Sequence, residues 1–383
     1  MCARMRRAGF KEIRTPQLLA RSLWERSGHW DKFGAQMYAL PEGSLGSSIG
    51  SSVPSSNNPS PGLRHDEAQT LCLKPMSCPC HVQVFNQGVR SWRELPIRYS
   101  EFGACHRDEP SGSLEGLKRT RAFVQDDAHV FCMQSQIEHE VARFCELLRA
   151  VYADLGFSSV TVALATRPAQ RAGDDAVWDR AEASLAAAAR AADLQFDILE
   201  GEGAFYGPKL EFQLADSRGR KWQCGTIQLD FVLPERLGAR FVNDRNEYES
   251  PVMVHHAVLG SMERFIAILL EHYAGWLPVW LAPEQVVVAS ISDPYAPYAM
   301  RVVGMLDDAG LRITADCRAE RLERKIVDAR EAQIPLMIVV GARDDRDQTV
   351  SIRKRNGEQA TLRLEEAVAA LLHEARLPDR QIG

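Results

Sequence analysis

The sequence predicts an α+β domain built on an antiparallel sheet, followed by a small α/β domain with a mixed sheet. Long strand-like runs with inserted helices fill the first part of the chain, whereas strands and helices alternate from Val286 on. Such alternation, with strands of buried type, is typical of α/β folds. The sequence texture changes near Leu277–Pro283, so we place the two domains at residues 1–278 and 279–383.

The elements of the first domain follow from local patterns. A helix ending at Gly9 precedes a strand, Phe10–Thr15, closed by Pro16. Residues 41–64 are rich in Ser, Gly and Pro and cannot bury enough apolar surface to become ordered, so we expect a disordered insertion. The remaining elements are the strands Ile97–Arg107 and Thr120–Phe131, a helix opened by a capping box at Ser135 and Glu138, a helix over Asp174–Leu194, the strands Lys209–Leu214 and Thr226–Val232, and a helix from near Ser261.

The second domain has a regular order of elements. Its apolar runs are of strand length and are separated by amphipathic stretches of helical length. We expect strand Val286–Ser292, helix Pro297–Asp308, strand Leu311–Cys317, helix Glu320–Gln333, strands Pro335–Gly341 and Val350–Arg353, and helix Leu364–Arg376.

Composition narrows the class of protein. With 45% hydrophobic and 25% charged residues, the chain of 383 residues is typical of a soluble globular protein, and no apolar run reaches the roughly 18 residues of a membrane span. No apolar segment follows the basic N-terminal residues, so we expect no signal peptide. Nine cysteines, an odd number, indicate a reduced, cytoplasmic protein. Because the net charge is −5, a nucleic-acid site must be a local basic patch.

Two arginines in separated segments are suited to binding phosphates. Arg107 ends a predicted strand, and Arg264 stands in the first helical turn of GSMERF, residues 260–265. A guanidinium forks onto two oxygens, so each can clamp a phosphate group. Glu109 can accept a hydrogen bond from an adenine amino group, and Phe123 offers a stacking face. For any single arginine, however, a surface salt bridge is the commoner explanation.

The spacing of Cys and His residues along the chain does not show which of them, if any, bind a metal. The run CPCH, Cys78–His81, suggests a structural zinc site. Other Cys and His residues stand far apart in the sequence, and a lone Cys or His is usually a core residue. From the residues alone, a local zinc site at CPCH and a set of ordinary core Cys and His residues both stay open.

Six segments together resemble the threonyl members of the class II aminoacyl-tRNA synthetases. They keep the order and spacing of the family's motifs, follow an N-terminal segment, AGFKEIRTP, that resembles the first motif, and extend the resemblance over nearly the whole chain. The segments are CLKPMSCPCHVQVFNQG, FGACHRDEPSGSLEGL, RAFVQDDAHVFC, GEGAFYGPKLEF, QCGTIQLDF and VHHAVLGSMERF.

The resemblance implies that Cys78, His129 and His255 hold one zinc ion per chain. Three protein ligands leave one position open, which in this family takes the amino group and the hydroxyl of L-threonine. Valine lacks the hydroxyl, and an apolar pocket alone would separate the two amino acids by only about 100-fold. Asp127, on the same strand face as His129, would accept the hydroxyl proton. The remainder of the amino-acid pocket would be Gln125, Tyr206 and Gln228.

The resemblance also implies an ATP site and a reaction in two steps. The threonine carboxylate attacks the α-phosphate of ATP, which binds with Mg²⁺, and the threonyl group then passes to the 3′ end of threonine tRNA. Arg107 would stabilise the α-phosphate, and Arg264 would hold the γ-phosphate and cover the adenine. ATP would contact Arg107, Glu109, Arg119, Phe123 and Arg264, and catalysis would involve Arg107, Arg264, Lys209 and His29.

The C-terminal domain resembles the anticodon-binding domain of class II synthetases but departs from its pattern. Ala319 and Glu323 replace an Asn and a Gly, and Asp344 stands where a glutamate reads the anticodon. A lost amide and a shifted carboxylate predict weaker base readout. The expected anticodon contacts are Arg318, Asp344 and Arg353, and the residues suited either to a phosphate backbone or to a solvated helix face are Arg318, Arg321, Arg324, Lys325 and Arg330.

Two further departures flank the expected zinc ligands. The family pattern has Gly at Cys80 and Arg at His256. A rival thiol and a rival imidazole beside the site would perturb it, although neither change removes a ligand.

The resemblance favours a homodimeric threonine–tRNA ligase, since the motif ending at Pro16 lies at the two-fold interface of class II enzymes. No residues precede that motif, so we expect the family's N-terminal editing region to be absent. Two alternatives stay open. One is a paralogue that makes threonyl-adenylate for a non-tRNA acceptor, which the altered anticodon residues favour. The other is a non-catalytic regulatory homologue that binds tRNA.

Overall fold

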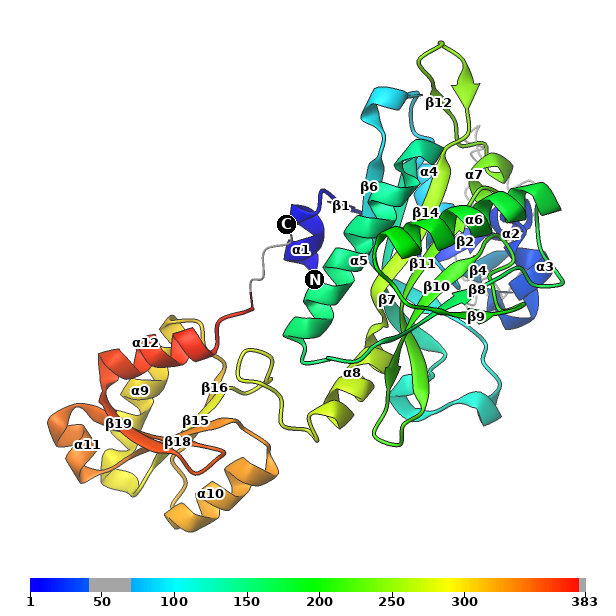
Figure 1. Cartoon of the computed structure of the whole chain (residues 1–383). Helices are drawn as coiled ribbons and strands as arrows, with labels where there is room; N and C mark the ends of the chain where they lie inside the picture. The colour runs from blue at the N-terminus through cyan, green and yellow to red at the C-terminus, as the bar shows by residue number, and fades with distance from the viewer. Residues whose placement is uncertain (41–69, 379–383) are drawn as a thin grey trace, which may run out of the picture. The chain divides into compact units, whose positions relative to one another are not determined.

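The structure is a computed structural model, and it describes residues 1–40 and 70–378 (Figure 1). The chain forms two compact units, Met1–Ile268 and Leu269–Gln381. The predicted disordered insertion, residues 41–64, lies outside the described residues. In the part that is described, no helix combines the length and the apolar character that crossing a membrane requires.

An eight-stranded sheet forms the centre of the first unit. Neighbouring strands are antiparallel except for the two edge pairs, β1 with β6 and β8 with β9, which are parallel. The predicted antiparallel class is therefore confirmed. In spatial order the strands are β1 (Lys11–Glu12), β6 (Ile97–His106), β7 (Ala122–Cys132), β14 (Val252–Ser261), β11 (Lys221–Asp230), β10 (Lys209–Ala215), β8 (Thr161–Ala165) and β9 (Asp197–Leu199).

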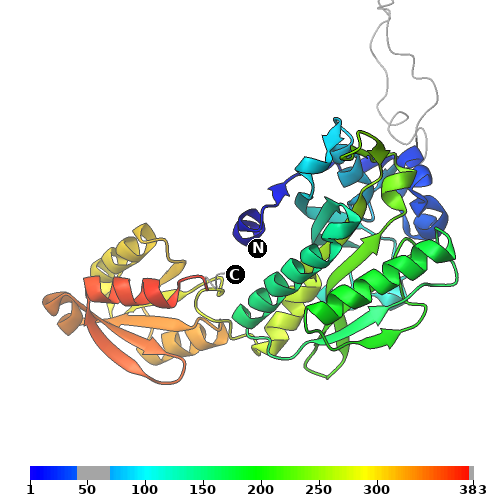
Figure 2. The ribbon, with the colours of Figure 1, turned by 45° about the horizontal axis from the view of Figure 1, so that its top comes forward.

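Two long helices, α5 (Ile137–Asp154) and α6 (Asp175–Ala191), lie against each other and cover one face of this sheet (Figures 1 and 2). The apolar residues spaced along one face of α5 are buried, and they are Ile137, Val141, Phe144, Leu148 and Val151. The predicted capping box at Ser135 and Glu138 is wrong, because a 3₁₀ turn, Gln134–Gln136, precedes α5 and the helix has no side-chain cap. The side chain of Asp174 caps α6 instead by accepting from the Val177 N–H.

Shorter elements cover the opposite face and the edges of the sheet. The apolar cluster beneath them contains Phe85, Phe131 and Phe241, which are almost fully buried. The helices are α1 (Cys2–Arg7), α2 (Arg21–Ser27), α3 (His29–Phe33), α4 (Cys78–Phe85) and α7 (Leu233–Arg236), with α8 (Met262–His272) following β14. The small sheets consist of β2 (Leu18–Ala20), β4 (Leu71–Leu73) and β3 (Ala39–Leu40), and of β13 (Tyr248–Glu249), β12 (Phe241–Val242) and β5 (Arg90–Ser91).

The second unit contains a five-stranded mixed sheet, as predicted. Its first three strands are parallel and the last two pairings are antiparallel. In spatial order they are β16 (Ile313–Asp316), β15 (Val286–Ser290), β17 (Leu336–Val340), β18 (Thr349–Lys354) and β19 (Gln359–Arg363), of which β19 was not predicted. The helices are α9 (Ala296–Asp308), α10 (Leu322–Glu331), α11 (Ala342–Asp347) and α12 (Leu364–Glu374).

The two faces of the second sheet are covered unequally. The α9 and α12 side carries the larger apolar core, which includes Val302 and Leu371. On the other side, Ala329 of α10 packs on Val287 and Val339 of the parallel strands.

Candidate functional site

Strand register places a row of polar side chains across the large sheet. His129 on β7 lies opposite His255 on β14, and His255 lies opposite Gln228 on β11. Gln228 in turn lies opposite Lys209 on β10. Because side chains alternate across a strand, all four point to the same face of the sheet, and all four line one cavity.

The cavity has a volume of about 560 Å³ and is built on this face of the sheet. On β7, Phe123, Gln125, Asp127 and His129 follow one another at alternate positions along its floor. Nearly all the predicted site residues of the first unit line it, and the one exception is His29. Those that do are Cys78, Arg107, Glu109, Arg119, Phe123, Gln125, Asp127, His129, Tyr206, Lys209, Gln228, His255 and Arg264.

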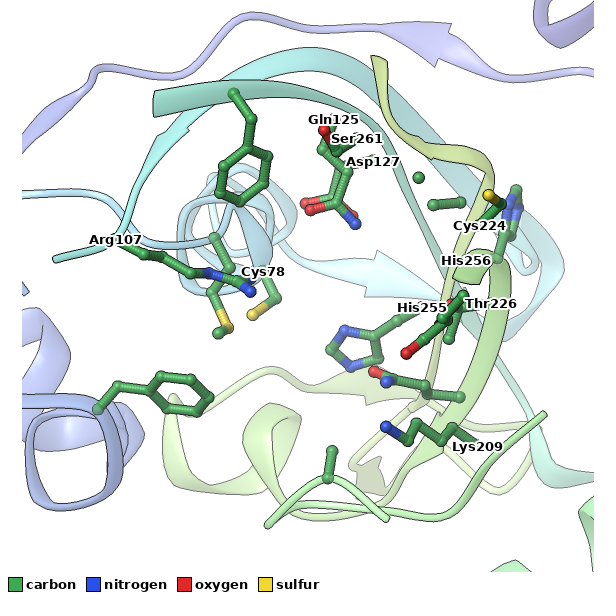
Figure 3. A pocket seen from close by; sticks show the side chains of 18 of the residues that line it. Cys78, Arg107, Gln125, Asp127, Lys209, Cys224, Thr226, His255, His256 and Ser261 are labelled. Carbon is green, nitrogen blue, oxygen red and sulfur yellow. The ribbon is translucent and has the colours of Figure 1, made fainter. Parts of the chain in front are cut away.

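Cys78, His129 and His255 come together at the deep end of the cavity. Their ligand atoms all lie within 4.8 Å of one another, and all three residues are buried. Cys78 begins α4, whereas the histidines come from neighbouring strands, and Cys78 and His255 point toward the same space (Figure 3). Among the residues described, Cys80 and His81 are not part of this group, so the local reading of CPCH as a ligand set is not supported.

The surroundings of these residues fit a metal cation. His255 directs Nε2 at Oδ2 of the buried Asp230, 2.9 Å away, whose Oδ1 accepts from the N–H groups of Val232 and Leu233. A carboxylate accepts only, so Nε2 of His255 carries the proton and Nδ1 has a free lone pair. That lone pair lies 3.1 Å from Nε2 of His129.

The thiol of Cys78 lies in surroundings that disfavour its ionised form. Burial, together with the charges of Asp127 and Asp230, raises the pKa of Cys78 well above its ordinary value. A thiolate here therefore needs a neighbouring positive charge. A sulfur and two imidazole nitrogens with carboxylate support behind one histidine form a donor set suited to zinc, with a fourth position left open.

The two departures beside the ligands do not point into the metal position. The ring of His256 packs at 5.1 Å from Phe10 and 4.9 Å from Phe144, on the α5 side of the sheet. Cys80 lies near Thr15 and Lys74, and burial raises its pKa to about 11. Neither residue belongs to the ligand group among the described residues, and the perturbation of the site by a rival thiol and a rival imidazole stays a prediction.

Polar groups surround the metal position on the cavity side. Oδ1 of Asp127 lies 3.6 Å from Nε2 of His129. Burial raises the pKa of Asp127, although His81 and His255 oppose that effect. The hydroxyl of Tyr206 donates to Oε1 of Gln228 at 2.7 Å, and its ring stacks on His255 with centroids 4.9 Å apart.

Arg264 is held in place by backbone groups. Its Nε donates to the carbonyl of Lys118 at 2.8 Å, and its Nη1 donates to the carbonyl of Gln223 at 2.9 Å. The guanidinium also lies over the ring of Trp222, 5.5 Å from the centroid. The head group is thus fixed at the cavity before any anion binds.

A sharp irregularity in β14 places Arg264 there. Register is lost between Ala257 and Ser261, and the Asp126 carboxylate accepts from the N–H groups of Val258, Leu259 and Gly260. Gly260 has φ +76°, and a Cβ there would lie 2.5 Å from the Cys224 carbonyl. Only glycine fits this turn, which leads directly into α8.

Three other cationic side chains line the cavity, Arg107, Arg119 and Lys209. The Arg107 guanidinium lies 5.1 Å from the centroid of Phe123, and its Nε donates to the Pro75 carbonyl. Arg119 forms an ion pair with Glu109 at 2.7 Å. At the far end of the histidine row, Lys209 pairs with Glu211 at 2.7 Å.

His29 lies behind the metal group instead of facing the cavity. It is fully buried, with Nδ1 2.8 Å from the hydroxyl of Ser27 and Nε2 2.9 Å from the sulfur of Met76. Its Nε2 is also 3.6 Å from the sulfur of Cys78. Burial and the neighbouring His255 lower the pKa of His29 to about 3, so its ring is neutral.

The predicted anticodon residues are partly engaged within the second unit. Asp344 accepts from the N–H of Gly341 and from the hydroxyls of Thr349 and Ser351, and Arg318 forms ion pairs with Asp316 and Asp328. Arg353 lies on β18, on the same face as Ser351.

The prediction that Lys325 is suited to bind a phosphate backbone is wrong. Lys325 is 1% exposed, and its ammonium donates to the carbonyls of Ser290 and Asp316. It therefore holds α10 on the sheet and is unavailable to a nucleic acid.

Sequence reasoning missed several residues that support the site. They are Asp230 behind His255, Asp126 beneath the β14 irregularity, Trp222 beside Arg264, and the pair His81 and Glu101 behind His129. The available signal was weak. Asp230 stands two residues after Gln228 and so shares its strand face, and His81 stands three residues after Cys78 on one helix face.

Comparison with protein families supports both units. Residues 62–273 match the model of the tRNA synthetase class II core domain (G, H, P, S and T), and residues 285–374 match that of an anticodon binding domain. The chain is 51% identical over 374 residues to a threonine–tRNA ligase of Gluconacetobacter diazotrophicus, covering 97% of this chain and 55% of that protein. A threonine–tRNA ligase of a Caulobacter species is also 51% identical, over 380 residues, which are 99% of this chain and 54% of that protein. The chain thus spans about half the length of these curated relatives.

Solved structures agree with this assignment. A crystal structure described as the RNA binding domain of threonyl-tRNA synthetase from Cryptosporidium parvum superposes with a TM-score of 0.88 at 35% identity, covering 98% of this chain and 88% of that chain. A crystal structure of a putative threonyl-tRNA synthetase from Aeropyrum pernix gives a TM-score of 0.77 at 26% identity, covering 97% of this chain and 86% of that one.

Proposed function

Because the chain belongs to the threonyl-tRNA synthetases of class II, we propose that it activates L-threonine with ATP and transfers the threonyl group to the 3′ end of threonine tRNA. The observation that carries the proposal is a single cavity holding a buried Cys–His–His group together with two fixed arginines. One end of this cavity suits a small hydroxylated amino acid, and the other suits the phosphates of a nucleotide.

We assign the amino-acid end to the residues around the metal position. Cys78, His129 and His255 would hold one zinc ion per chain, and zinc bound there supplies a Lewis acid for the amino and hydroxyl groups of threonine. Asp127, beside His129, accepts the hydroxyl proton through a carboxylate oxygen. The other walls of this end are Gln125, Tyr206 and Gln228.

We assign the cationic end of the cavity to ATP and Mg²⁺. Arg107 stabilises the charge that develops on the α-phosphate, and Arg264 holds the γ-phosphate. Phe123 offers its ring to the adenine, and Glu109 accepts from the adenine amino group. Lys209 and Arg119 add positive charge. No protein nucleophile is required, since the threonine carboxylate itself attacks the α-phosphate and pyrophosphate leaves.

In the second step, the terminal ribose hydroxyl of tRNA attacks the adenylate and AMP leaves. We propose His29 as a residue that assists this transfer. Because its ring is buried beside Met76 and Cys78, that role requires a rearrangement around α3.

The second unit is proposed to bind the anticodon stem and loop of threonine tRNA. We assign the catalytic domain to residues 1–278 and the anticodon-binding domain to residues 279–383. Arg318, Asp344 and Arg353 are the proposed contacts. The open face of β18 and β19, where Arg353 lies beside Ser351 and Thr361, offers polar groups for single-stranded bases.

Two assays on one preparation test the function. Threonine-dependent exchange of pyrophosphate into ATP reports adenylate formation, and charging of threonine tRNA reports the transfer. Exchange without charging would instead favour the paralogue that loads another acceptor, a possibility raised by Ala319 and Glu323. Absence of both activities would favour a non-catalytic tRNA-binding homologue.

The nine free cysteines support a reduced, cytoplasmic setting.

We also expect a homodimer. The N-terminal segment adds the short strand β1 to the edge of the large sheet beside β6, and in class II enzymes this motif lies at a two-fold interface. Light scattering at micromolar concentration should give about twice the mass of 42.8 kDa. A monomeric mass that persists on raising the concentration tenfold would contradict this prediction.

A further inference from the structure

A chain of buried hydrogen bonds leads away from His129 on the side opposite the metal position. Nδ1 of His129 lies 2.8 Å from Nδ1 of His81, and Nε2 of His81 lies 3.1 Å from Oε2 of Glu101. The three side chains are 1%, 0% and 5% exposed. The chain joins strand β7 to helix α4 and to strand β6.

The Glu101 carboxylate is held from two further segments. The fully buried Lys74 donates to Oε1 at 2.8 Å, and the N–H of Thr15 donates to the same oxygen at 3.1 Å. The Thr15 hydroxyl donates to Oε2 and accepts from Lys74, each at 2.8 Å. Hydrogen bonds from His81 and Lys74 lower the pKa of Glu101 to about 2, although burial opposes them. Glu101 is therefore a fixed, ionised acceptor.

The direction of each hydrogen bond follows from this acceptor. Glu101 accepts only, so the His81 proton is on Nε2. With the Nε2 proton directed at Glu101, the other ring nitrogen of His81, Nδ1, is the acceptor that faces His129. The proton between the two rings then belongs to Nδ1 of His129, and Nε2 of His129 has a free lone pair directed at the metal group.

The opposite assignment would close the site. If His81 carried protons on both nitrogens, Nδ1 of His129 would accept, and its Nε2 would donate to Nδ1 of His255, 3.1 Å away. His129 and His255 would then satisfy each other and offer the metal one lone pair fewer. The Glu101 side of the chain thus decides between an open and a closed donor set.

We propose that His81 and Glu101 are positioning residues that present Nε2 of His129 to the metal, with Lys74 and Thr15 fixing Glu101. The inference rests on the proposed zinc site. It also gives the CPCH run a different role from the one its spacing suggests. Cys78 supplies a ligand, and His81, one helical turn later, orients another ligand.

Zinc affinity, measured by chelator competition, tests the proposal without relying on activity. His81→Leu fills the space but cannot accept from His129, so we expect zinc to bind about 10- to 100-fold more weakly. His81→Asn places an amide oxygen near the Nδ1 position and should recover part of the loss. Co²⁺ substitution adds a second readout. The visible spectrum of the Co²⁺-loaded wild type reports a thiolate-bearing site, and the spectrum of Co²⁺-loaded His81→Leu should be shifted relative to it.

Matched variants separate the possible outcomes. Gln83 lies on the same helix as His81 but takes no part in the hydrogen bonds that link His129, His81 and Glu101, so Gln83→Ala should bind zinc like the wild type. Cys78→Ala should bind none. If His81→Leu does not fold by circular dichroism, Glu101→Gln replaces it, because Lys74 and His81 donate to different carboxylate oxygens and the amide puts a donor NH2 group in place of one of them. Wild-type zinc affinity in His81→Leu, or in Glu101→Gln, would overturn this inference but not the proposed metal site. A folded wild type without zinc would overturn the proposed metal site itself.

Discussion

We expect Arg264→Ala to slow threonine-dependent ATP–pyrophosphate exchange by about 10²- to 10³-fold, equivalent to about 3–4 kcal/mol of transition-state stabilisation. The carbonyls of Lys118 and Gln223 fix the guanidinium before ATP arrives. A fixed cation needs no reorganisation as charge develops on the phosphates, so its removal is felt mainly in the transition state. The loss should therefore appear in kcat as well as in KM for ATP.

Two comparison variants sharpen this test. Arg264→Lys keeps the charge but loses the planar fork whose separate nitrogens bind the two carbonyls, so its exchange rate should fall between the wild type and Arg264→Ala. Arg245→Ala removes an arginine that is 75% exposed on a distant turn, and its exchange rate should be unchanged. Exchange within about threefold of the wild type in a folded Arg264→Ala variant would mean that this arginine does not act on the phosphates.

The parts of the catalytic unit with clear periodicity could be predicted from sequence. Strand β6 and helix α5 each have one face that is more buried than the other, so their alternation or helical spacing is visible. The alternation along β7 also predicts that Asp127 and His129 share a face. Predictions were wrong where the local sequence pattern does not determine the structure, as for the helix start expected at Ser135.

The strand that carries His255 shows why part of the site was not predictable from pattern. β14 lies in the middle of the sheet and is buried on both faces over nearly its whole length. A strand covered on both sides has no alternation of polar and apolar residues, and its two adjacent histidines interrupt the apolar run. Only the resemblance to a family drew attention to His255, while the sheet register explains its place opposite His129.

Partners of buried polar groups were also beyond local reasoning. Glu101 and Asp230 reach their histidines through pairings of segments that are 20 and 25 residues apart, and Lys74 reaches Glu101 across 27. Such contacts depend on the three-dimensional arrangement of separate elements. In the second unit the same limit made Lys325 look like a surface cation, although it binds backbone carbonyls in the interior.

The largest effect that we expect is the rejection of valine. In pyrophosphate exchange, kcat/KM for valine should lie about 10⁴-fold or more below that for threonine, because a site built to bind a hydroxyl leaves buried polar groups unpaired when the hydroxyl is missing. Serine keeps the amino and hydroxyl groups and lacks one methyl group, which is worth about 1–3 kcal/mol, so its kcat/KM should fall by only about 10- to 200-fold. Exchange is the appropriate assay, since it reports activation before any later hydrolysis.

A substitution at Asp127 shows whether the hydroxyl is the group being recognised. Asp127→Ala removes the carboxylate beside His129 that would take the hydroxyl proton. Threonine and serine activation should therefore fall together, while the slow valine reaction, which has no hydroxyl to bind, stays near its wild-type rate. The ratio of threonine to valine would shrink although the cavity becomes larger, which an explanation based on shape alone does not predict. Equal loss for all three amino acids would show instead that Asp127 supports the structure of the pocket, and efficient valine activation by the wild type would contradict selection through the hydroxyl.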